Sequence, residues 1–251
     1  MPVDATGQMY APSHPPERVI SLVPSLTESL FDLGAGDSLV GLTDFCLFPE
    51  QSVKALPRLG GTKTPDLVAI RELHPDLVYL NLEENLRRHG ETIASFAQTF
   101  VTEPKSVADV ILLLRSLAEI HWRSADRLVG EINDELALCQ AIKPFSFAVP
   151  IWKEPWMWCG GDTYVSNLVA AAGGRNVVGH LPRYPALGIE EVTALRPDVV
   201  FLPDEPFVFT ESDGDWLSKM FGSRIVGPFP GHLFTWHGSR TSSTASRHLT
   251  P

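Results

Sequence analysis

Aromatic residues gather in one short stretch of this sequence. The segment WKEPWMWCGG, residues 152–161, holds Trp152, Trp156 and Trp158, three of the six tryptophans in the chain. An aromatic side chain buries about 150–250 Å² while only two torsion angles become fixed, so a group of them suits a large, flat ligand. The same proline-broken stretch would also suit a loop that packs against the base of a domain. Trp158 lies closest to the next predicted helix, and we expect it to pack rather than to bind.

Other candidate side chains come directly after apolar runs that read as buried strands. Loops that follow parallel strands meet at the carboxyl edge of the sheet, where ligands of α/β proteins bind. Such loops include TDFCLFPE, NLEEN, PRYPALG and PFPGHLFTWHG. The sequence therefore predicts ligand-binding residues at these ends, namely Asp44, Phe45, Asn81, Trp152, Trp156, Tyr184, Asp204 and Trp236.

Cysteine and histidine residues give weak signals. Cys46, Cys139 and Cys159 are odd in number, widely spaced and outside any CxxC pair, so we expect three small buried hydrophobic residues. Cys46 as a soft metal ligand is a less favoured alternative. His232 and His237 could coordinate a metal, but a separation of five positions is poor ligand spacing. We predict no resident metal or cofactor.

Catalytic motifs are missing from the sequence. It contains no GxSxG elbow, P-loop, GxGxxG or HExxH motif. Cys159 precedes a predicted helix, whose N-terminus could stabilise a thiolate, but no base stands at an evident position. We therefore predict a binding protein rather than an enzyme.

Composition excludes several classes of function. The chain has 251 residues, of which 44% are hydrophobic and 20% charged, with a formal net charge of −10. Binding to nucleic acid needs clustered Lys and Arg, and this sequence has no such cluster. No apolar stretch of about 18 residues is present, and the N-terminal residues lack the basic and apolar regions of a secretory signal. On this basis we expect either that the protein is cytoplasmic or that a leader peptide is missing from the numbered sequence.

Apolar runs alternate with helical patterns and indicate an α/β fold. Strands are expected at 18–23, 38–43, 77–80 and 99–103, and the pattern restarts with a strand at 145–152. Strands that alternate with helices are typical of a mainly parallel sheet flanked by helices.

Two pairs of segments repeat in the same order. ELHPDLVYLN at 72–81 matches ALRPDVVFLP at 194–203, and LGAGDSLVG at 33–41 matches AAGGRNVVG at 171–179. Between the copies, the segment from Ser106 to about Ile142 has helical periodicity, with a bend possible near Trp122 to Ala125. The repeat predicts an N-terminal lobe at 1–104, one long linking helix at 105–143 and a C-terminal lobe at 144–251.

An ordered set of segments carries a family resemblance. RVISLVPSLTESLFDLGAGDSLVG, LPRLGGTKTPDLVAIRELHPDLVYL, GGDTYVSNLVAAAGGRNVVG, GIEEVTALRPDVVFL and TWHGSR together resemble the helical-backbone (type III) substrate-binding proteins of ABC importers, and the cobalamin-binding group in particular. The resemblance implies two α/β lobes joined by a rigid helix. It also implies a ligand bound between the lobes and delivered to permease subunits by a monomeric periplasmic or cell-surface protein.

The resemblance leaves the ligand open. A corrinoid such as cobalamin is the first expectation, and haem or a ferric siderophore is the alternative. Gly60 to Lys63 lack the aromatic residue that cobalamin-binding members carry in this region, which leaves smaller corrinoids, haem and siderophores open as ligands. A cytoplasmic sensor or enzyme that reuses the fold is a further alternative.

The resemblance also implies two docking acids, one in each lobe. Glu28 in PSLTES and Glu190 in GIEEV match the pattern of acids that contact arginines of the permease. We place both in the first turn of a helix, in corresponding positions. Each could instead be an acid that interacts favourably with its own helix N-terminus.

Overall fold

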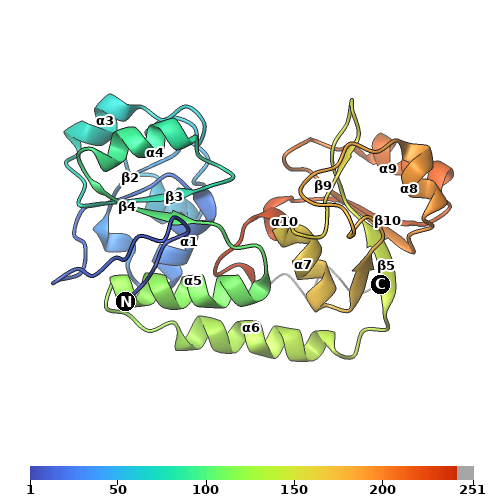
Figure 1. The fold of residues 1–251 in the computed structure, drawn as a ribbon, viewed down its shortest axis with the longest axis horizontal. Coiled ribbons are helices and arrows are strands. Elements are labelled where there is room, and N and C mark those ends of the chain that lie inside the picture. Colours follow the sequence, from blue (N-terminus) through green and yellow to red (C-terminus); the bar gives the residue numbers. More distant parts are fainter. Residues whose placement is uncertain (242–251) are drawn as a thin grey trace. The chain divides into compact units, whose positions relative to one another are not determined.

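The computed structural model describes residues 1–241, and Figure 1 shows their fold. These residues form two compact units. The first unit contains Met1–Pro104, Val110–Gly130 and Gly238–Arg240, and the second contains Lys105–Asp109, Glu131–His237 and Thr241. The segment Gly238–Arg240 thus adds residues from late in the sequence to the first unit.

A four-stranded parallel sheet in the order β2-β1-β3-β4 forms the centre of the first unit. Its strands are β1 (Val19–Ser21), β2 (Leu39–Leu42), β3 (Leu77–Asn81) and β4 (Gln98–Thr102). The helices between them are α1 (Pro24–Asp32), the 3-10 turn η1 (Gly36–Ser38), α2 (Glu50–Val53), α3 (Leu67–Glu72) and α4 (Arg87–Ala94). All residues of β1 and β3 are buried, as expected of parallel strands covered on both faces.

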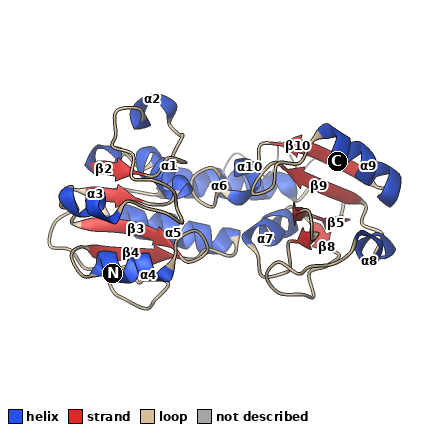
Figure 2. Ribbon diagram, turned by 90° about the horizontal axis from the view of Figure 1, so that it is seen from above, coloured by secondary structure: helices blue, strands red, loops and turns tan. Residues whose placement is uncertain are grey.

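The second unit has its own four-stranded parallel sheet, in the order β10-β9-β5-β8. Its strands are β5 (Phe145–Ala148), β8 (Gly174–Asn176), β9 (Val199–Pro203) and β10 (Arg224–Phe229). A short antiparallel hairpin joins β6 (Pro150–Trp152) to β7 (Met157–Trp158). The helices are α7 (Tyr164–Ala171), α8 (Ile189–Ala194), α9 (Glu211–Phe221) and α10 (His232–Thr235). Figure 2 shows strands and helices of both units in separate colours.

The two units share one topology. In each, the first strand along the chain lies between the second and the third, and the fourth strand is at the far edge. β1, β2, β3 and β4 thus correspond to β5, β8, β9 and β10. This arrangement confirms the α/β fold with mainly parallel sheets. The internal repeat therefore reflects a duplicated supersecondary unit, α3–β3 in one copy and α8–β9 in the other.

The repeated basic-Pro dipeptide ends a helix in both units. His74 and Arg196 follow α3 and α8, and both adopt left-handed backbone conformations, with φ of 46° and 50°. Pro75 and Pro197 come next and cannot continue a helix. The chain therefore turns directly from a short helix into a buried strand.

The single linking helix expected over 105–143 is wrong in one respect. The segment forms two helices, α5 (Val107–Ile120) and α6 (Asp126–Cys139). Trp122, at φ 53°, interrupts the helical backbone between them. The Ser124 hydroxyl then accepts a hydrogen bond from the Asp126 N–H at 3.1 Å, which starts the second helix. The break lies within the region where the sequence had allowed a bend.

Candidate functional site

In the first unit, an acid and an aromatic ring follow the carboxyl end of β2. Asp44 is exposed, and its N–H donates to the Gly60 carbonyl at 2.9 Å. The Phe45 side chain is 57% exposed and its ring lies against Gly61, where a Cβ would stand only 3.3 Å from the ring. Gly61 thus leaves room for the Phe45 ring, whereas a Cβ at Gly60 would stand 2.6 Å from the Thr64 carbonyl oxygen.

Asn81, the last residue of β3, has a structural role in the described fold. It is 2% exposed, and its Oδ1 accepts hydrogen bonds from the N–H groups of Glu83 at 2.8 Å and Glu84 at 3.2 Å. Its Nδ2 donates to the Thr102 hydroxyl at 3.2 Å. Lys63 Nζ donates to the Glu83 carbonyl at 2.5 Å. Asn81 therefore shapes the turn after the strand, and little of its amide is open to a ligand.

In the second unit, aromatic rings from three segments form one cluster, which we call the aromatic surface. It consists of Trp152, Trp156, Phe207, Phe209 and Trp216. Trp156 stacks on Phe209 and on Trp216, with ring centroids 5.9 Å apart in both pairs and interplanar angles of 12° and 10°. Trp152 meets Phe207 edge to face at 5.5 Å. Trp152 and Trp216 are 41% and 43% exposed, so the cluster reaches the surface.

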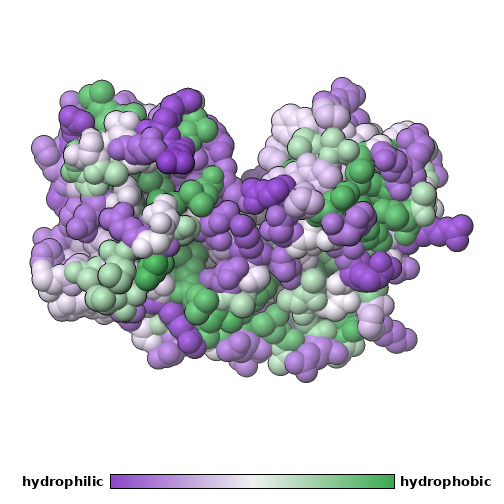
Figure 3. Space-filling model, viewed as in Figure 1, coloured by the Kyte–Doolittle hydropathy of each residue, from purple (hydrophilic) through white to green (hydrophobic). Residues whose placement is uncertain are grey.

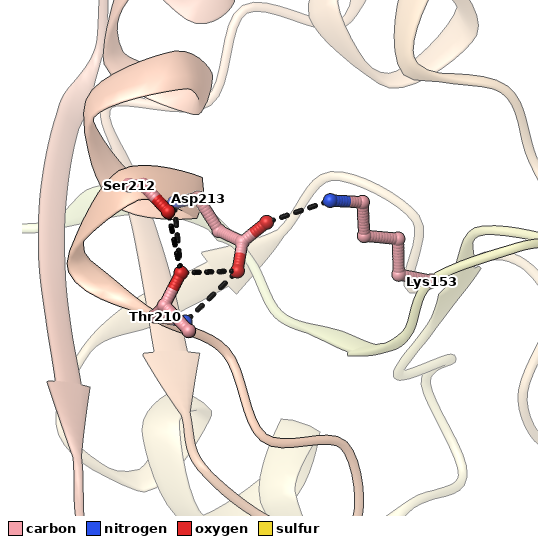
Figure 4. A network of polar contacts seen from close by, with 4 residues as sticks. All are labelled: Lys153, Thr210, Ser212 and Asp213. Atoms are coloured by element: carbon pink, nitrogen blue, oxygen red, sulfur yellow. Dashed lines mark hydrogen bonds and ion pairs between the residues drawn. The ribbon is translucent and has the colours of Figure 1, made fainter.

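An ion pair borders the aromatic surface. Lys153, next to Trp152 in the hairpin, has its Nζ 2.7 Å from Oδ1 of Asp213 in α9 (Figure 4). The Thr210 N–H and hydroxyl donate to the other carboxylate oxygen of Asp213 at 2.9 and 2.8 Å. Burial acts to raise the pKa of Asp213, but the hydrogen bonds from Lys153 and Thr210 outweigh it and lower that pKa. Asp213 is therefore an ionised partner for Lys153 at neutral pH.

Tyr184, Asp204 and Trp236 lie elsewhere in the second unit's loops. Tyr184 is half-buried against the core, and the Arg183 guanidinium lies 5.6 Å from its ring centroid. Asp204 Oδ1 accepts a hydrogen bond from the Gly231 N–H at 2.6 Å, which fixes the turn after β10. Trp236 is half-buried, 5.5 Å from the His232 ring.

Three members of the aromatic surface were missed from the sequence. Phe207 and Phe209 alternate in the loop after β9, in the segment PDEPFVFT, and this alternation was the available signal. Trp216 lies in a helix, where nothing in the sequence indicated that it would meet Trp156. Trp158 packs as expected: it is fully buried, and its Nε1 donates to the Leu187 carbonyl at 3.0 Å.

The three cysteines are free and buried, as the sequence predicted. Thr27 and Thr43 hydroxyls lie 3.1 Å from Cys46 Sγ, and burial raises the pKa of this thiol. Burial also lowers the pKa of His237, to about 4. Within residues 1–241, no group of three or more His, Cys, Asp or Glu side chains is arranged to hold a metal ion.

The two proposed docking acids differ in environment. Glu28 is the fifth residue of α1 and not part of its first turn, so that expectation is wrong. Arg240 binds its carboxylate through Nε at 2.9 Å and Nη2 at 2.5 Å, and both side chains are only 15% exposed. Glu190 is exposed in the first turn of α8. The helix that corresponds to α8 is α3, so the two acids are not at equivalent positions.

On the face shown in Figure 3, both hydrophilic and hydrophobic residues reach the surface of each unit. A hollow of about 430 Å³ lies in the first unit between the N-terminal segment, β3 and α4, and Asn81 is among its lining residues. Within the described part of the chain, no helix has the length and apolarity needed to span a membrane.

Comparisons with known proteins agree with this architecture. A family model described as periplasmic binding protein matches residues 19–214. The vitamin B12-binding protein of Photorhabdus laumondii subsp. laumondii is 27% identical over 195 residues, which cover 74% of this chain and 70% of that protein.

Two solved structures have a similar fold. A periplasmic haem-binding protein from Roseiflexus sp. RS-1, solved in its apo form, is 25% identical with a TM-score of 0.77, covering 93% of this chain and 96% of that one. The periplasmic vitamin B12 binding protein of Vibrio cholerae is 20% identical with a TM-score of 0.76, covering 94% and 96%. The resemblance found in the sequence is confirmed, and the chain belongs to the periplasmic binding protein family.

Proposed function

We propose that this protein binds a metal chelate of the corrinoid class and delivers it to an ABC importer. The observation that carries the proposal is the aromatic surface, where Trp152 and Trp216 remain exposed while they pack on Phe207 and Trp156. A corrin is a broad, flat, largely apolar ring, and flat aromatic faces bury such a ring with little loss of conformational freedom. The vitamin B12-binding proteins among the relatives support the same ligand class.

Haem is the second candidate. A porphyrin has a similar flat shape, and a haem-binding protein is among the structures with the same fold. The described side chains include no cluster suited to hold iron, although a single axial ligand would not require one. A ferric siderophore fits the aromatic surface less closely, because its shape is compact rather than flat.

Delivery and location form the next part of the proposal. We assign Trp152 and Phe45, as exposed rings, to ligand contact, and Glu190 to contact with the permease. An exposed carboxylate on a rigid element can pair with a permease arginine and fix orientation. Glu28 is less suited because Arg240 already binds it. The family supports a periplasmic location rather than that of a cytoplasmic sensor or enzyme.

Titration of the purified protein tests ligand binding. Cobinamide, cobalamin and haemin are added separately while tryptophan fluorescence and ligand absorbance are recorded. We expect saturable quenching with at least one corrinoid, and replacement of Trp152 by Ala to weaken that binding about tenfold. Trp122, 61% exposed between α5 and α6, supplies the matched control, since W122A should leave affinity unchanged. No response to any of the three below about 100 µM would refute the proposal.

A transport assay tests the docking assignment separately. Replacing Glu190 by Gln should leave ligand affinity unchanged but reduce uptake by cells that carry the importer. Glu191, its neighbour in α8, supplies the control, because its carboxylate already accepts a hydrogen bond from the Gly188 N–H at 2.6 Å. Replacing Glu191 by Gln should leave uptake unchanged. Equal uptake by E190Q and wild type would remove Glu190 from the docking role.

A further inference from the structure

The charges around the aromatic surface indicate which chelates it accepts. Lys153 stands in the hairpin between Trp152 and Trp156, so a cation lies beside the rings. Its ammonium group is 2.7 Å from Asp213, and the two side chains are 34% and 13% exposed. A lysine in this position would bind a ligand carboxylate if it had no internal partner.

Asp213 is held in place independently of Lys153. The Thr210 N–H and hydroxyl both donate to its second oxygen, and the Asp213 N–H donates back to the Thr210 hydroxyl at 3.3 Å (Figure 4). This reciprocal cap starts α9 and fixes the carboxylate before any ligand arrives. The fold itself therefore holds Asp213 where its negative charge offsets the positive charge of Lys153.

Acidic residues stand in the same loops as the rings, and one arginine accompanies them, because Arg183 lies in the segment that pairs with the hairpin through Met157 and Ala186. Glu154 follows Lys153 in the hairpin, and Glu205 follows β9. In the first unit, exposed Asp44 stands beside Phe45, while Lys63 is directed to a backbone carbonyl. Each candidate surface thus presents aromatic rings with acidic neighbours.

We propose that Asp213 is a specificity-determining residue that neutralises Lys153 and so favours uncharged or cationic chelates over anionic ones. A corrinoid with neutral amide side chains meets no penalty at this surface. A haem carries two propionates that would approach acidic side chains and find Lys153 already paired. This inference rests on the proposed function and concerns the same binding surface.

Replacing Asp213 by Asn tests it. The amide oxygen of Asn can still accept from Thr210, so the helix cap is kept while the negative charge is lost. Free Lys153 should then strengthen haemin binding roughly two- to fivefold, as expected for one partly exposed charge contact. Cobinamide, which is cationic, should bind equally or more weakly.

Two further variants isolate the charge effect. The double variant K153Q/D213N should lose the gain for haemin, because no cation remains. K153Q alone leaves the Asp213 carboxylate without its cation. This variant should bind haemin more weakly relative to cobinamide than wild type does. It also tests the inference if D213N fails to fold. E91Q supplies a matched control, since it removes the acid of the exposed Arg87–Glu91 pair on α4. This variant should bind haemin and cobinamide as tightly as wild type does.

The outcomes separate this inference from the proposed function. If wild type binds cobinamide but the haemin-to-cobinamide affinity ratio is the same in wild type, D213N and K153Q, the role of Asp213 is wrong and the binding function stands. If wild type binds neither chelate, the proposed function itself fails. A ratio that moves toward haemin in D213N and away from it in K153Q supports the inference.

Discussion

At the scale of single residues, the aspartate of the repeated sequence has one role in both units. Asp76 accepts hydrogen bonds from the N–H groups of Glu17 and Arg18, just before β1, at 2.8 and 3.1 Å. Asp198 accepts from the Ser146 N–H and hydroxyl in β5, both at 2.6 Å. In each unit the aspartate thus ties the third strand to the start of the first. The decapeptide recurs because two sheets need the same strand-to-strand connection.

The Glu28–Arg240 pair should contribute to stability. The Arg240 guanidinium carbon also lies 4.6 Å from the centroid of the Phe48 ring. Two contacts therefore hold the segment Gly238–Arg240 in place, the ion pair with Glu28 on α1 and the stacking on Phe48. Replacing Arg240 by Met leaves Glu28 in a partly buried site without its partner. We expect this to lower the free energy of unfolding by about 2 kcal/mol at pH 7.5, measured by urea denaturation.

The pH dependence distinguishes lost charge pairing from lost packing. Burial raises the pKa of Glu28 while Arg240 opposes that rise, so the pKa should rise further in R240M. A carboxyl with a raised folded-state pKa stabilises the fold more as pH falls, so the deficit of R240M should narrow toward pH 5. The double variant E28Q/R240M should recover part of the loss. A deficit that is constant with pH would assign it to packing on Phe48 instead.

At the scale of elements, the break between α5 and α6 depends on one unusual residue. Tryptophan rarely adopts the left-handed conformation, because its Cβ crowds the following carbonyl at a cost of about 1–2 kcal/mol. Trp122 adopts it at φ 53° while 61% exposed. Asn tolerates this conformation and β-branched residues do not.

Substitutions at this position should therefore change stability in opposite directions. Trp122→Asn should raise the free energy of unfolding by up to about 1 kcal/mol, and Trp122→Val should lower it by about 1 kcal/mol. Leu112, 60% exposed within α5, supplies the control, since Leu112→Asn removes a similarly exposed apolar side chain at a helical position and should not stabilise. If Asn and Val at 122 gave the same stability, the backbone conformation would not be the cause.

The sequence predicted the elements that depend on local pattern. The buried strands followed from apolar runs, because parallel strands covered on both faces are apolar along their length. The repeat and the buried cysteines followed from the spacing of residues in the sequence. The helix break was only allowed, not predicted, since no Gly or Pro marks Trp122. Only two of the five rings of the aromatic surface were predicted, because contacts such as the stacking of Trp216 on Trp156 join segments distant in sequence. Pairings such as Glu28–Arg240 lie beyond any local signal for the same reason.

At the scale of the whole molecule, each unit buries a histidine that must remain neutral. His121 in the first unit is 3% exposed, and its Nε2 lies 2.9 Å from the Tyr79 hydroxyl. Burial raises the pKa of Tyr79 well above its usual range, so the phenol is protonated, and the His121 tautomer sets which of the two groups donates. His237 in the second unit is 8% exposed against the Tyr164 ring. Burial is the main cause that lowers the pKa of both histidines to about 4.

Both units should therefore lose stability in mild acid. The unfolded chain binds a proton at each histidine near pH 6.5 while the folded chain does not, so stability is full above pH 6.5 and declines as pH falls toward 4. Each histidine should account for about 2–3 kcal/mol at pH 4. Asp198 and Asp213, whose pKa values are lowered, act only at lower pH, since their unfolded value is 3.8. Glu28, whose pKa is raised by burial, acts in the opposite direction, and His89, whose pKa burial lowers, adds to the decline of the first unit.

Chemical denaturation at half-unit steps between pH 7.5 and 4 measures this decline. His237→Phe keeps a ring against Tyr164 but binds no proton, so the decline assigned to the second unit should disappear while that of the first remains. A flat profile in wild type, or an unchanged one in H237F, would show that the buried histidines accept protons without unfolding. With the expected result, the protein would be most stable at neutral pH, and both of its units would unfold more readily in acid.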